Sequence, residues 1–280
     1  MKPDIIPAQR RKVILDLIRR RGVLSVHELA SATEVSQPTI RRDLDHLAKA
    51  GVIERSHGGA ILKEFSGTTH EPDHHITATM AREEKAAIAR VAVDQLKDNQ
   101  SVIFDSSTTV FEAARLAVER QLCLTVVTND LRISELFAPC ANVRLIVCGG
   151  TIRPGSYSLV GEPGSGFLRQ LKVDVALMGT HALNTTACYD TSLEISYIKR
   201  HMVAAAKKVL VLADSSKFGQ VAFFEAFRID EKTEVISDRL PSLSTRQALE
   251  KKGAVLRCGH SKSGGRNSKE NITAYEEKLN

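Results

Sequence analysis

Residues 35–51 restrict the fold of this chain more than any other stretch, because they predict one short amphipathic helix with a signal at each end. Ser36 is a good N-cap acceptor, Pro38 is tolerated in the first turn, and Gly51 can take the left-handed position that ends a helix. At about 100° per residue, the apolar and cationic positions separate onto opposite sides, with Ile40, Leu44, Leu47 and Ala48 against Arg42, His46 and Lys49.

Two further helices are predicted before this one. Pro7 suits a first helical position, and apolar residues then recur at helical spacing until Gly22. Ser25 and Glu28 have the spacing of a capping box, which opens a second, short helix. A tight turn at residues 33–36 follows, so the order of helix, helix, turn and helix places the third helix where a recognition helix lies.

A hairpin is expected after the third helix. Residues 52–55 and 60–62 resemble two short strands, and residues 56–59 would join them. Three helices and a hairpin predict a winged helix-turn-helix, whose wing tip can touch the phosphate backbone of DNA. We expect DNA contacts from Ser36, Gln37, Pro38, Thr39, Arg41, Arg42, His46, Arg55 and His57.

The charge distribution favours a DNA-binding unit over an amphipathic helix whose basic side is merely solvated. The 280-residue chain carries a formal net charge of +6. Residues 1–65 hold 12 Lys and Arg against 8 Asp and Glu, so most of the excess lies in the first quarter of the chain. A local basic bias is typical of a domain that binds nucleic acid. The length itself predicts two domains.

The remaining composition excludes several classes of protein. No apolar run of 18 residues and no signal peptide is visible, so we expect no membrane association. The five cysteines show no C-x-x-C pairing and predict reduced core thiols in a cytoplasmic protein. Residues 65–80 read as a linker, and its His70, His74 and His75 lack the partners of a metal site. We expect no metal and no cofactor.

From residue 81 the pattern changes to alternating helices and strands, which predicts an α/β domain with a mainly parallel sheet. Helices are expected at 82–96 and 111–119, and strands at 101–104, 124–127, 143–147, 173–177 and 209–212. In such sheets a ligand binds beyond the carboxyl ends of the strands.

Polar loops follow four of these strands and predict a site for an anionic small molecule. Hydroxyls and backbone N–H groups gather where a helix begins, glycines allow close approach, and an arginine and a lysine supply charge. The alternative interpretation, for each loop taken singly, is that its polar side chains only cap the helix that follows. We expect effector contacts from Asp105, Ser106, Ser107, Thr108, Thr109, Thr128, Asn129, Gly149, Gly150, Arg153 and Lys217.

The chain resembles the DeoR family of bacterial transcriptional regulators. In the N-terminal part the resemblance rests on Val35-Ser36, on residues 39–44 and on residues 57–60; in the larger domain it rests on residues 105–109, 128–129, 149–153, 194, 199 and 214–219. It implies a sensor domain similar in fold to ribose-5-phosphate isomerase, glucosamine-6-phosphate deaminase and CoA transferases. It also implies a phosphorylated sugar as ligand and adds Glu194 and Lys199 to the effector contacts.

Two departures from the family pattern bear on the effector. Ser107 stands where many members have glycine, which crowds the loop or demands a shifted backbone. Residues 184–190 lack the glycine that usually precedes the helix with Glu194 and Lys199. We therefore expect an effector different from those of the better-known family members. The glycines of residues 161–166 do not have dinucleotide-loop spacing and predict a turn.

These observations predict a DNA-binding regulator. The resemblance implies a repressor of a carbohydrate or sugar-acid operon that a phosphorylated metabolite releases. Since one winged helix covers a single half-site, we expect a homo-oligomer, a dimer or a tetramer, on double-stranded operator DNA. The alternative is a sugar-phosphate isomerase or transferase with an appended DNA-binding domain, in which Glu194 and Lys199 act as acid and base. The expected domains are residues 1–64, a linker at 65–80, a sensor at 81–258 and a disordered tail at 259–280.

Overall fold

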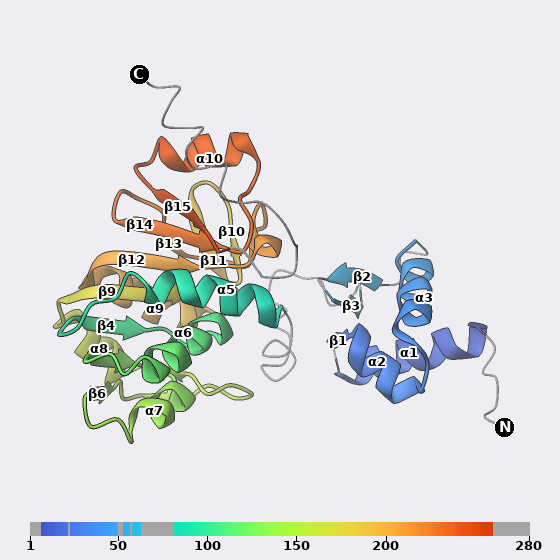
Figure 1. Cartoon of the computed structure of the whole chain (residues 1–280), viewed down its shortest axis with the longest axis horizontal. Coiled ribbons are helices and arrows are strands. Elements are labelled where there is room, and N and C mark those ends of the chain that lie inside the picture. Colours follow the sequence, from blue (N-terminus) through green and yellow to red (C-terminus); the bar gives the residue numbers. More distant parts are fainter. Residues whose placement is uncertain (1–6, 22, 50–52, 57, 63–80, 260–280) are drawn as a thin grey trace.

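The computed structural model describes residues 7–21, 23–49, 53–56, 58–62 and 81–259. The predictions for Gly51, for His57, for the linker histidines and for the tail from residue 260 therefore lie outside the described residues. The chain forms an N-terminal helical unit with a small sheet and a larger α/β domain, which confirms the predicted fold class (Figure 1).

The N-terminal unit contains three helices, α1 (Pro7–Arg21), α2 (Val26–Thr33) and α3 (Gln37–Lys49). Their apolar sides meet in one core, which includes Ile14, Ile18, Leu29, Ile40, Leu44 and Leu47. The capping box of α2 is present, because the Ser25 hydroxyl accepts from the Glu28 N–H at 3.1 Å and a Glu28 carboxylate oxygen accepts from the Ser25 N–H at 2.9 Å. The second helix thus begins where the sequence predicts.

The small sheet contains one strand that the sequence did not predict. Strands β2 (Ile53–Ser56) and β3 (Gly59–Leu62) form the expected hairpin, and β1 (Val23–Ser25) pairs antiparallel with the other side of β3. A Cβ atom on Gly59 would lie 2.3 Å from the carbonyl oxygen of Leu24. Only glycine fits where these two backbones meet, so the hairpin is fastened to the helical unit.

The larger domain is built on seven parallel strands in the order β15-β14-β12-β9-β4-β5-β6. In that order they are Val255–Cys258, Thr233–Ser237, Ala206–Leu212, Val173–Gly179, Ser101–Phe104, Thr125–Thr128 and Arg144–Val147. All five predicted strands are present. The strands are short and rich in β-branched residues, as expected of a sheet that is covered on both faces.

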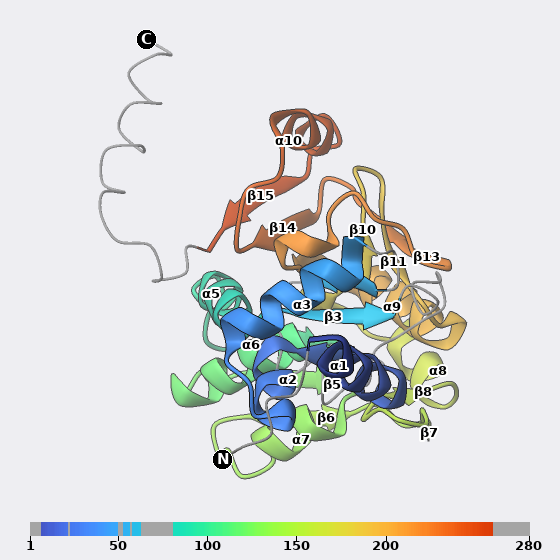
Figure 2. The same cartoon turned by 90° about the vertical axis from the view of Figure 1, so that its right-hand side faces the viewer.

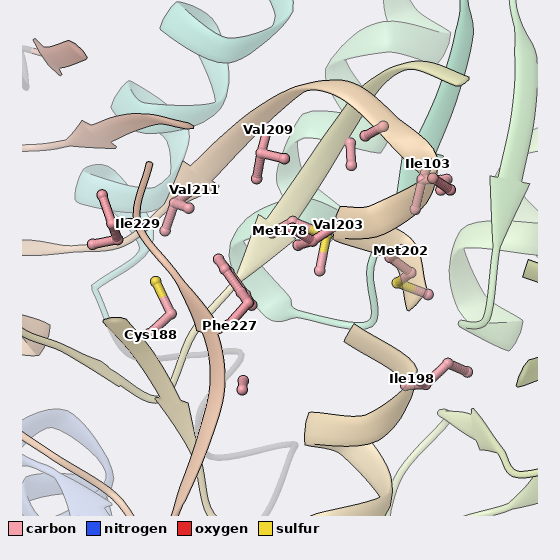
Figure 3. Close-up of a cluster of buried hydrophobic side chains, with 14 of the residues drawn as sticks. Ile103, Met178, Cys188, Ile198, Met202, Val203, Val209, Val211, Phe227 and Ile229 are labelled. Carbon is pink, nitrogen blue, oxygen red and sulfur yellow. The ribbon is translucent and has the colours of Figure 1, made fainter. Parts of the chain in front are cut away.

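Helices cover both faces of this sheet, with α5 (Arg82–Val93) and α6 (Thr108–Glu119) on one side and α8 (Gly164–Arg169) and α9 (Leu193–Ala205) on the other (Figure 2). The alternation of side chains along β12 makes both cores. Leu210 and Leu212 pack under α5 and α6, whereas Val209 and Val211 pack with Met178, Ile198 and Met202 of the α9 side (Figure 3).

Shorter elements complete the larger domain. They are α7 (Leu131–Phe137), α10 (Leu243–Glu250), the hairpin of β7 (Thr151–Ile152) and β8 (Leu159–Val160), and an antiparallel sheet of β10 (Ala182–Leu183), β11 (Ala187–Asp190) and β13 (Phe224–Arg228). The sequence analysis did not predict this second sheet. Its strands are short: β10 and β11 form a local hairpin, and β13 pairs with β11 from a distant part of the chain.

All five cysteines are free thiols. Cys148 and Cys188 are buried, and burial raises their pKa values to about 11 and about 12. Cys123 is exposed, so the expectation of a core thiol is wrong for that residue. Among the helices that the structure describes, none has both the length and the apolarity needed to cross a bilayer.

Candidate functional site

The outer side of α3 carries most of the residues predicted to contact DNA. Ile40, Leu44 and Leu47 are buried behind it, while the opposite side is exposed along Gln37, Pro38, Arg41, Arg42, His46 and Lys49. At the start of the helix, the hydroxyl oxygens of Ser36 and Thr39 lie 3.0 Å apart. The structure therefore presents hydroxyl, amide and guanidinium groups on one rigid surface, which suits phosphate and base-edge contacts.

Arg10 and Asp43 fix α3 from behind, and the sequence analysis missed this pair. Arg10 Nε donates to Asp43 Oδ2 at 2.5 Å, and the two side chains are only 13% and 6% exposed. Asp43 lies on the apolar stripe of α3, between Ile40 and Leu47. A charged residue on an apolar stripe is the signal that could have revealed it, because such a charge is buried only when it is paired.

The wing strand β2 is linked to the recognition helix by charge. Arg55 Nε lies 3.4 Å from Asp45 Oδ1, and both side chains are partly exposed. A surface pair of this kind contributes at most about 1 kcal/mol. Arg55 can exchange this carboxylate for a phosphate at little cost, so the predicted DNA contact is compatible with the structure and stays a prediction.

The carboxyl edge of the seven-stranded sheet has its topological switch point between β4 and β9. The chain runs outward from β4 through β5 and β6, then returns to β9 and continues outward through β12, β14 and β15. Loops that leave adjacent strands in opposite directions leave a crevice, where ligands of open α/β sheets bind. Asp105 follows β4 and Thr180 follows β9, so both stand at this point.

A buried charge cluster of Asp105, Asp190 and Lys199 lies beside the switch point. Lys199 Nζ is 3.2 Å from Asp105 Oδ2 and 2.9 Å from Asp190 Oδ2, and it donates to the Gly179 carbonyl at 2.8 Å. The Gly179 N–H donates to Asp105 Oδ2 at 3.0 Å. The cluster joins α9, β11, β9 and the loop after β4, so it fixes the loops from which the site is built.

Burial and pairing shift the three groups in different directions. Burial raises the pKa of the Asp105 carboxyl above its ordinary value, even though Lys199 opposes the shift. Burial alone would also raise the pKa of Asp190 and lower that of Lys199. Their mutual attraction outweighs burial, so the pKa of Asp190 lies below its ordinary value and that of Lys199 lies above it.

The loop after β4 is held in place by the side chain of Asn129, from the loop after β5, and by one of its own side chains. The Ser106 N–H donates to Asn129 Oδ1 at 3.1 Å, and the Ser107 hydroxyl accepts from the Thr109 N–H at 3.2 Å. Within the described residues, the N–H groups of Ser107 and Thr108 have no hydrogen-bond partner. These two donors at the start of α6 are what a phosphate requires.

Ser107, the departure from the family pattern, needs no shifted backbone. Its φ of −154° and ψ of 146° are ordinary extended values, and its hydroxyl caps α6. The crowded position is Gly179, at the end of the neighbouring strand β9. A Cβ atom on Gly179 would lie 2.3 Å from both Cβ and Oγ of Ser107.

Thr128 and Asn129 are fully buried and support the loops rather than lining a surface. The Thr128 hydroxyl donates to the Phe104 carbonyl at 2.8 Å. Asn129 Nδ2 donates to the Leu159 carbonyl at 3.1 Å, which ties the β7–β8 hairpin to the strand end. That hairpin follows Gly149 and Gly150, which are exposed, and it carries Arg153.

Glu194 and Lys199 do not form the pair that was considered for them. Lys199 is buried in the charge cluster, whereas Glu194 is exposed and accepts from the Ser192 hydroxyl at 2.6 Å. That hydrogen bond, with the nearby charge of Arg153, lowers the pKa of Glu194. Glu194 and Arg153 thus lie near each other, although they come from α9 and from the hairpin.

The loop after β12 carries Lys217, whose charge acts on Lys85, a lysine that the sequence analysis missed. Asp214 is buried and accepts from the Ser216 N–H at 3.0 Å, which fixes the short turn that carries Lys217. Lys85 of α5 is buried and lies in the field of Asp214 and of Lys217. Like Asp43, it is a charged residue on an apolar stripe, here with Ile88, Ala89 and Ala92.

No group of three His, Cys, Asp and Glu side chains in the described ranges could hold a metal ion. A helix-turn-helix unit of the kind that binds DNA precedes an α/β domain with a polar site at its switch point. This combination defines the class of DNA-binding regulators with a small-molecule sensor domain.

Comparison with known proteins supplies the family. Residues 10–65 match the model of the DeoR-like helix-turn-helix domain, and residues 80–239 match that of the DeoR C-terminal sensor domain. The chain belongs to the DeoR family of transcriptional regulators.

Several relatives are similar over most of their length. The glycerol-3-phosphate regulon repressor of Escherichia coli (strain K12) is 32% identical over 86% of this chain and 94% of its own. The HTH-type transcriptional regulator GlpR of Haloferax volcanii is 34% identical over 90% of this chain and 98% of its own. Both are transcriptional regulators, not enzymes, which sets aside the isomerase interpretation.

Among solved structures, ribose 5-phosphate isomerase A of Methanocaldococcus jannaschii aligns with 48% of this chain and 53% of its own, at 17% identity and a TM-score of 0.36.

Proposed function

We propose that this regulator represses a carbohydrate or sugar-acid catabolic operon, and that a phosphorylated sugar-type metabolite bound at the switch point releases it from the operator. The observation that carries the proposal is the start of α6, where two backbone N–H groups have no partner among the described residues and lie beside the charge cluster of Asp105, Asp190 and Lys199. A helix N-terminus attracts a phosphate, and Arg153 and Lys217 add positive charge from neighbouring loops.

The DNA-binding half of the proposal assigns the exposed side of α3 to the major groove and the β2–β3 hairpin to the phosphate backbone. Arg41 and Arg42 offer guanidinium groups at the start of the helix, and His46 lies one turn further on. One such unit reads one half-site, so the proposal includes a homo-oligomer on repeated or palindromic sites.

Repression is proposed because several relatives carry the word repressor in their names. Two of them are the glycerol-3-phosphate regulon repressor and the HTH-type transcriptional repressor GlcR of Bacillus subtilis. For release to occur, the metabolite must bind the DNA-incompetent arrangement more tightly than the competent one, since affinity alone shifts no equilibrium.

The test has two steps on the full-length protein. A thermal-shift screen with glycerol 3-phosphate, phosphorylated sugars and phosphorylated sugar acids identifies a ligand, because a molecule that binds only the native state raises the Tm. Operator binding is then measured with and without that ligand on promoter fragments from near the protein's own gene. We expect binding that the ligand weakens. A protein that binds none of these fragments, or binds them identically with every candidate, would refute the proposal.

A further inference from the structure

Lys85 is a buried cation that none of the roles above requires. Its side chain belongs to the second turn of α5, and the residue is only 4% exposed. Lysine is seldom buried to this extent unless carboxylates are close. The charged groups around Lys85 therefore decide what it does.

The helix that carries Lys85 touches both halves of the proposed effector site. Helix α5 packs along α6, whose first turn holds the unpaired N–H groups, and it also packs against β12 and β14 (Figure 1). The loop that leaves β12 holds Asp214 and Lys217.

The charges around Lys85 come from three elements. Asp214 and Lys217 act on it from the loop after β12, Glu112 acts from α6 and Glu84 from α5 itself. Burial lowers the pKa of the Lys85 amine to about 8, with the positive charge of Lys217 acting in the same direction and the carboxylates opposing it. Two lysine ammonium groups that act on the same bound dianion attract it more strongly than either does alone.

The start of α5 is also the point at which the chain enters the sensor domain from the DNA-binding unit. Ala81 precedes the helix with φ of 51° and ψ of 40°, a left-handed conformation that is uncommon for alanine, and no side chain caps the helix. The Lys85 N–H donates to the Ala81 carbonyl at 2.9 Å. Through the sequence, residues 63–80 join this point to β3 of the wing.

We propose that Lys85 couples the effector site to DNA binding: a phosphate bound beside Lys217 attracts the Lys85 ammonium and shifts the first turns of α5, where the chain leaves for the DNA-binding unit. This inference rests on the proposed function, because it presumes an anionic effector that alters operator affinity. The Lys85 N–H is bonded to the Ala81 carbonyl, so a displacement of Lys85 moves the point at which the chain enters α5.

The test compares four full-length proteins: the natural sequence, Lys85→Gln, Lys85→Arg and Arg90→Gln. Arg90 is the matched control, because it is an exposed cation on the same helix. The measured quantity is the ratio of operator Kd values with and without glycerol 3-phosphate, ribose 5-phosphate or inorganic phosphate. We expect a ratio of about tenfold or more in the natural protein and in Arg90→Gln, a typical allosteric coupling, and a ratio within about threefold of unity in Lys85→Gln.

The outcomes separate this inference from the proposed function. If no probe changes operator affinity in the natural protein, the proposed function fails and the coupling fails with it. If the natural protein responds and Lys85→Gln responds equally, only the coupling role of Lys85 is overturned. Lys85→Arg keeps the charge in a similar volume, so it retains the coupling even if Lys85→Gln folds poorly.

The pH dependence of effector affinity distinguishes this role of Lys85 from a purely structural one. The protonated amine attracts an anion, and a lowered pKa of about 8 means that the amine loses its proton between pH 7 and 9. A sugar phosphate is already a dianion in this range, since its second pKa is about 6. Effector affinity measured by calorimetry should therefore fall as the pH rises in the natural protein and stay flat in Lys85→Arg; identical profiles would overturn the inference.

Discussion

The ammonium of Lys199 lies 3.2 Å from Oδ2 of Asp105, with both side chains almost completely buried. This contact joins α9, on one face of the sheet, to the loop that begins α6 on the other face. A ligand that displaces the loop after β4 therefore acts on both layers of the domain.

Replacement of Lys199 by methionine should destabilise the protein by about 3–5 kcal/mol, because Asp105 and Asp190 would then be buried without a cation. Urea denaturation measures this loss. Lys207→Met is the control: Lys207 is 74% exposed and pairs with Asp174 at 2.9 Å, so its loss should cost no more than about 1 kcal/mol. Equal losses in the two variants would contradict the structural role of the cluster.

Alanine at position 179 should destabilise the domain by roughly 1–3 kcal/mol through overpacking against Ser107. Ser107→Gly removes the contacting atoms, and replacing a cap serine by glycine costs only a few tenths of a kcal/mol. The double variant should therefore be more stable than Gly179→Ala alone. Denaturation of the three proteins tests the steric origin, and additive losses would exclude it.

Replacement of Arg41 and Arg42 by alanine should weaken operator binding by about 1–3 kcal/mol per arginine and leave metabolite binding unchanged. The slope of affinity against salt concentration should fall by about one for each phosphate that the variant no longer neutralises. Fluorescence anisotropy with labelled DNA measures both. Arg115→Ala, an exposed arginine of α6, serves as the control, and a double variant with unchanged operator affinity would refute the assignment of α3.

Asp174 should contribute stability that acid removes. It accepts from the Ser101 N–H at 3.0 Å and from the Ser101 hydroxyl at 2.8 Å, and with Lys207 these bonds hold its pKa well below the ordinary value. The folded state thus binds its proton less readily than the unfolded state, so the contribution is complete above the unfolded pKa of about 4 and disappears as the pH falls below it.

Asp174→Asn should consequently be less stable than the natural protein at pH 7, with the difference shrinking between pH 4 and 2. Thermal unfolding over this pH range provides the measurement. A difference that stays constant with pH would show that the carboxylate charge has no part in it.

Local sequence signals were sufficient where the determining atoms lie within a few residues of each other. The capping box of Ser25 and Glu28 has the predicted hydrogen bonds, and the helix around Ile40 and Leu44 has the predicted buried side. The alternation of strands and helices after residue 81 was enough to predict the parallel sheet, because strands covered on both faces are recognisable by composition.

The strands β10, β11 and β13 were not predicted, because β10 and β11 are only two and four residues long and β13 pairs with β11 from a distant part of the chain. The same is true of the site. Asp190 and Lys85 were missed because nothing in their immediate neighbours shows that one lies beside Lys199 and the other near Asp214.

The sequence alone determined the type of DNA-binding unit, the class of the second domain and the strand ends at which polar residues gather, since periodicity and capping act over one or two turns. The tertiary structure decided which charges are buried, which N–H groups stay unpaired and which lysine lies beside the site. Those properties depend on solvent exclusion and on distances between residues far apart in the chain, such as Asp105 and Lys199, and only the packed fold sets them.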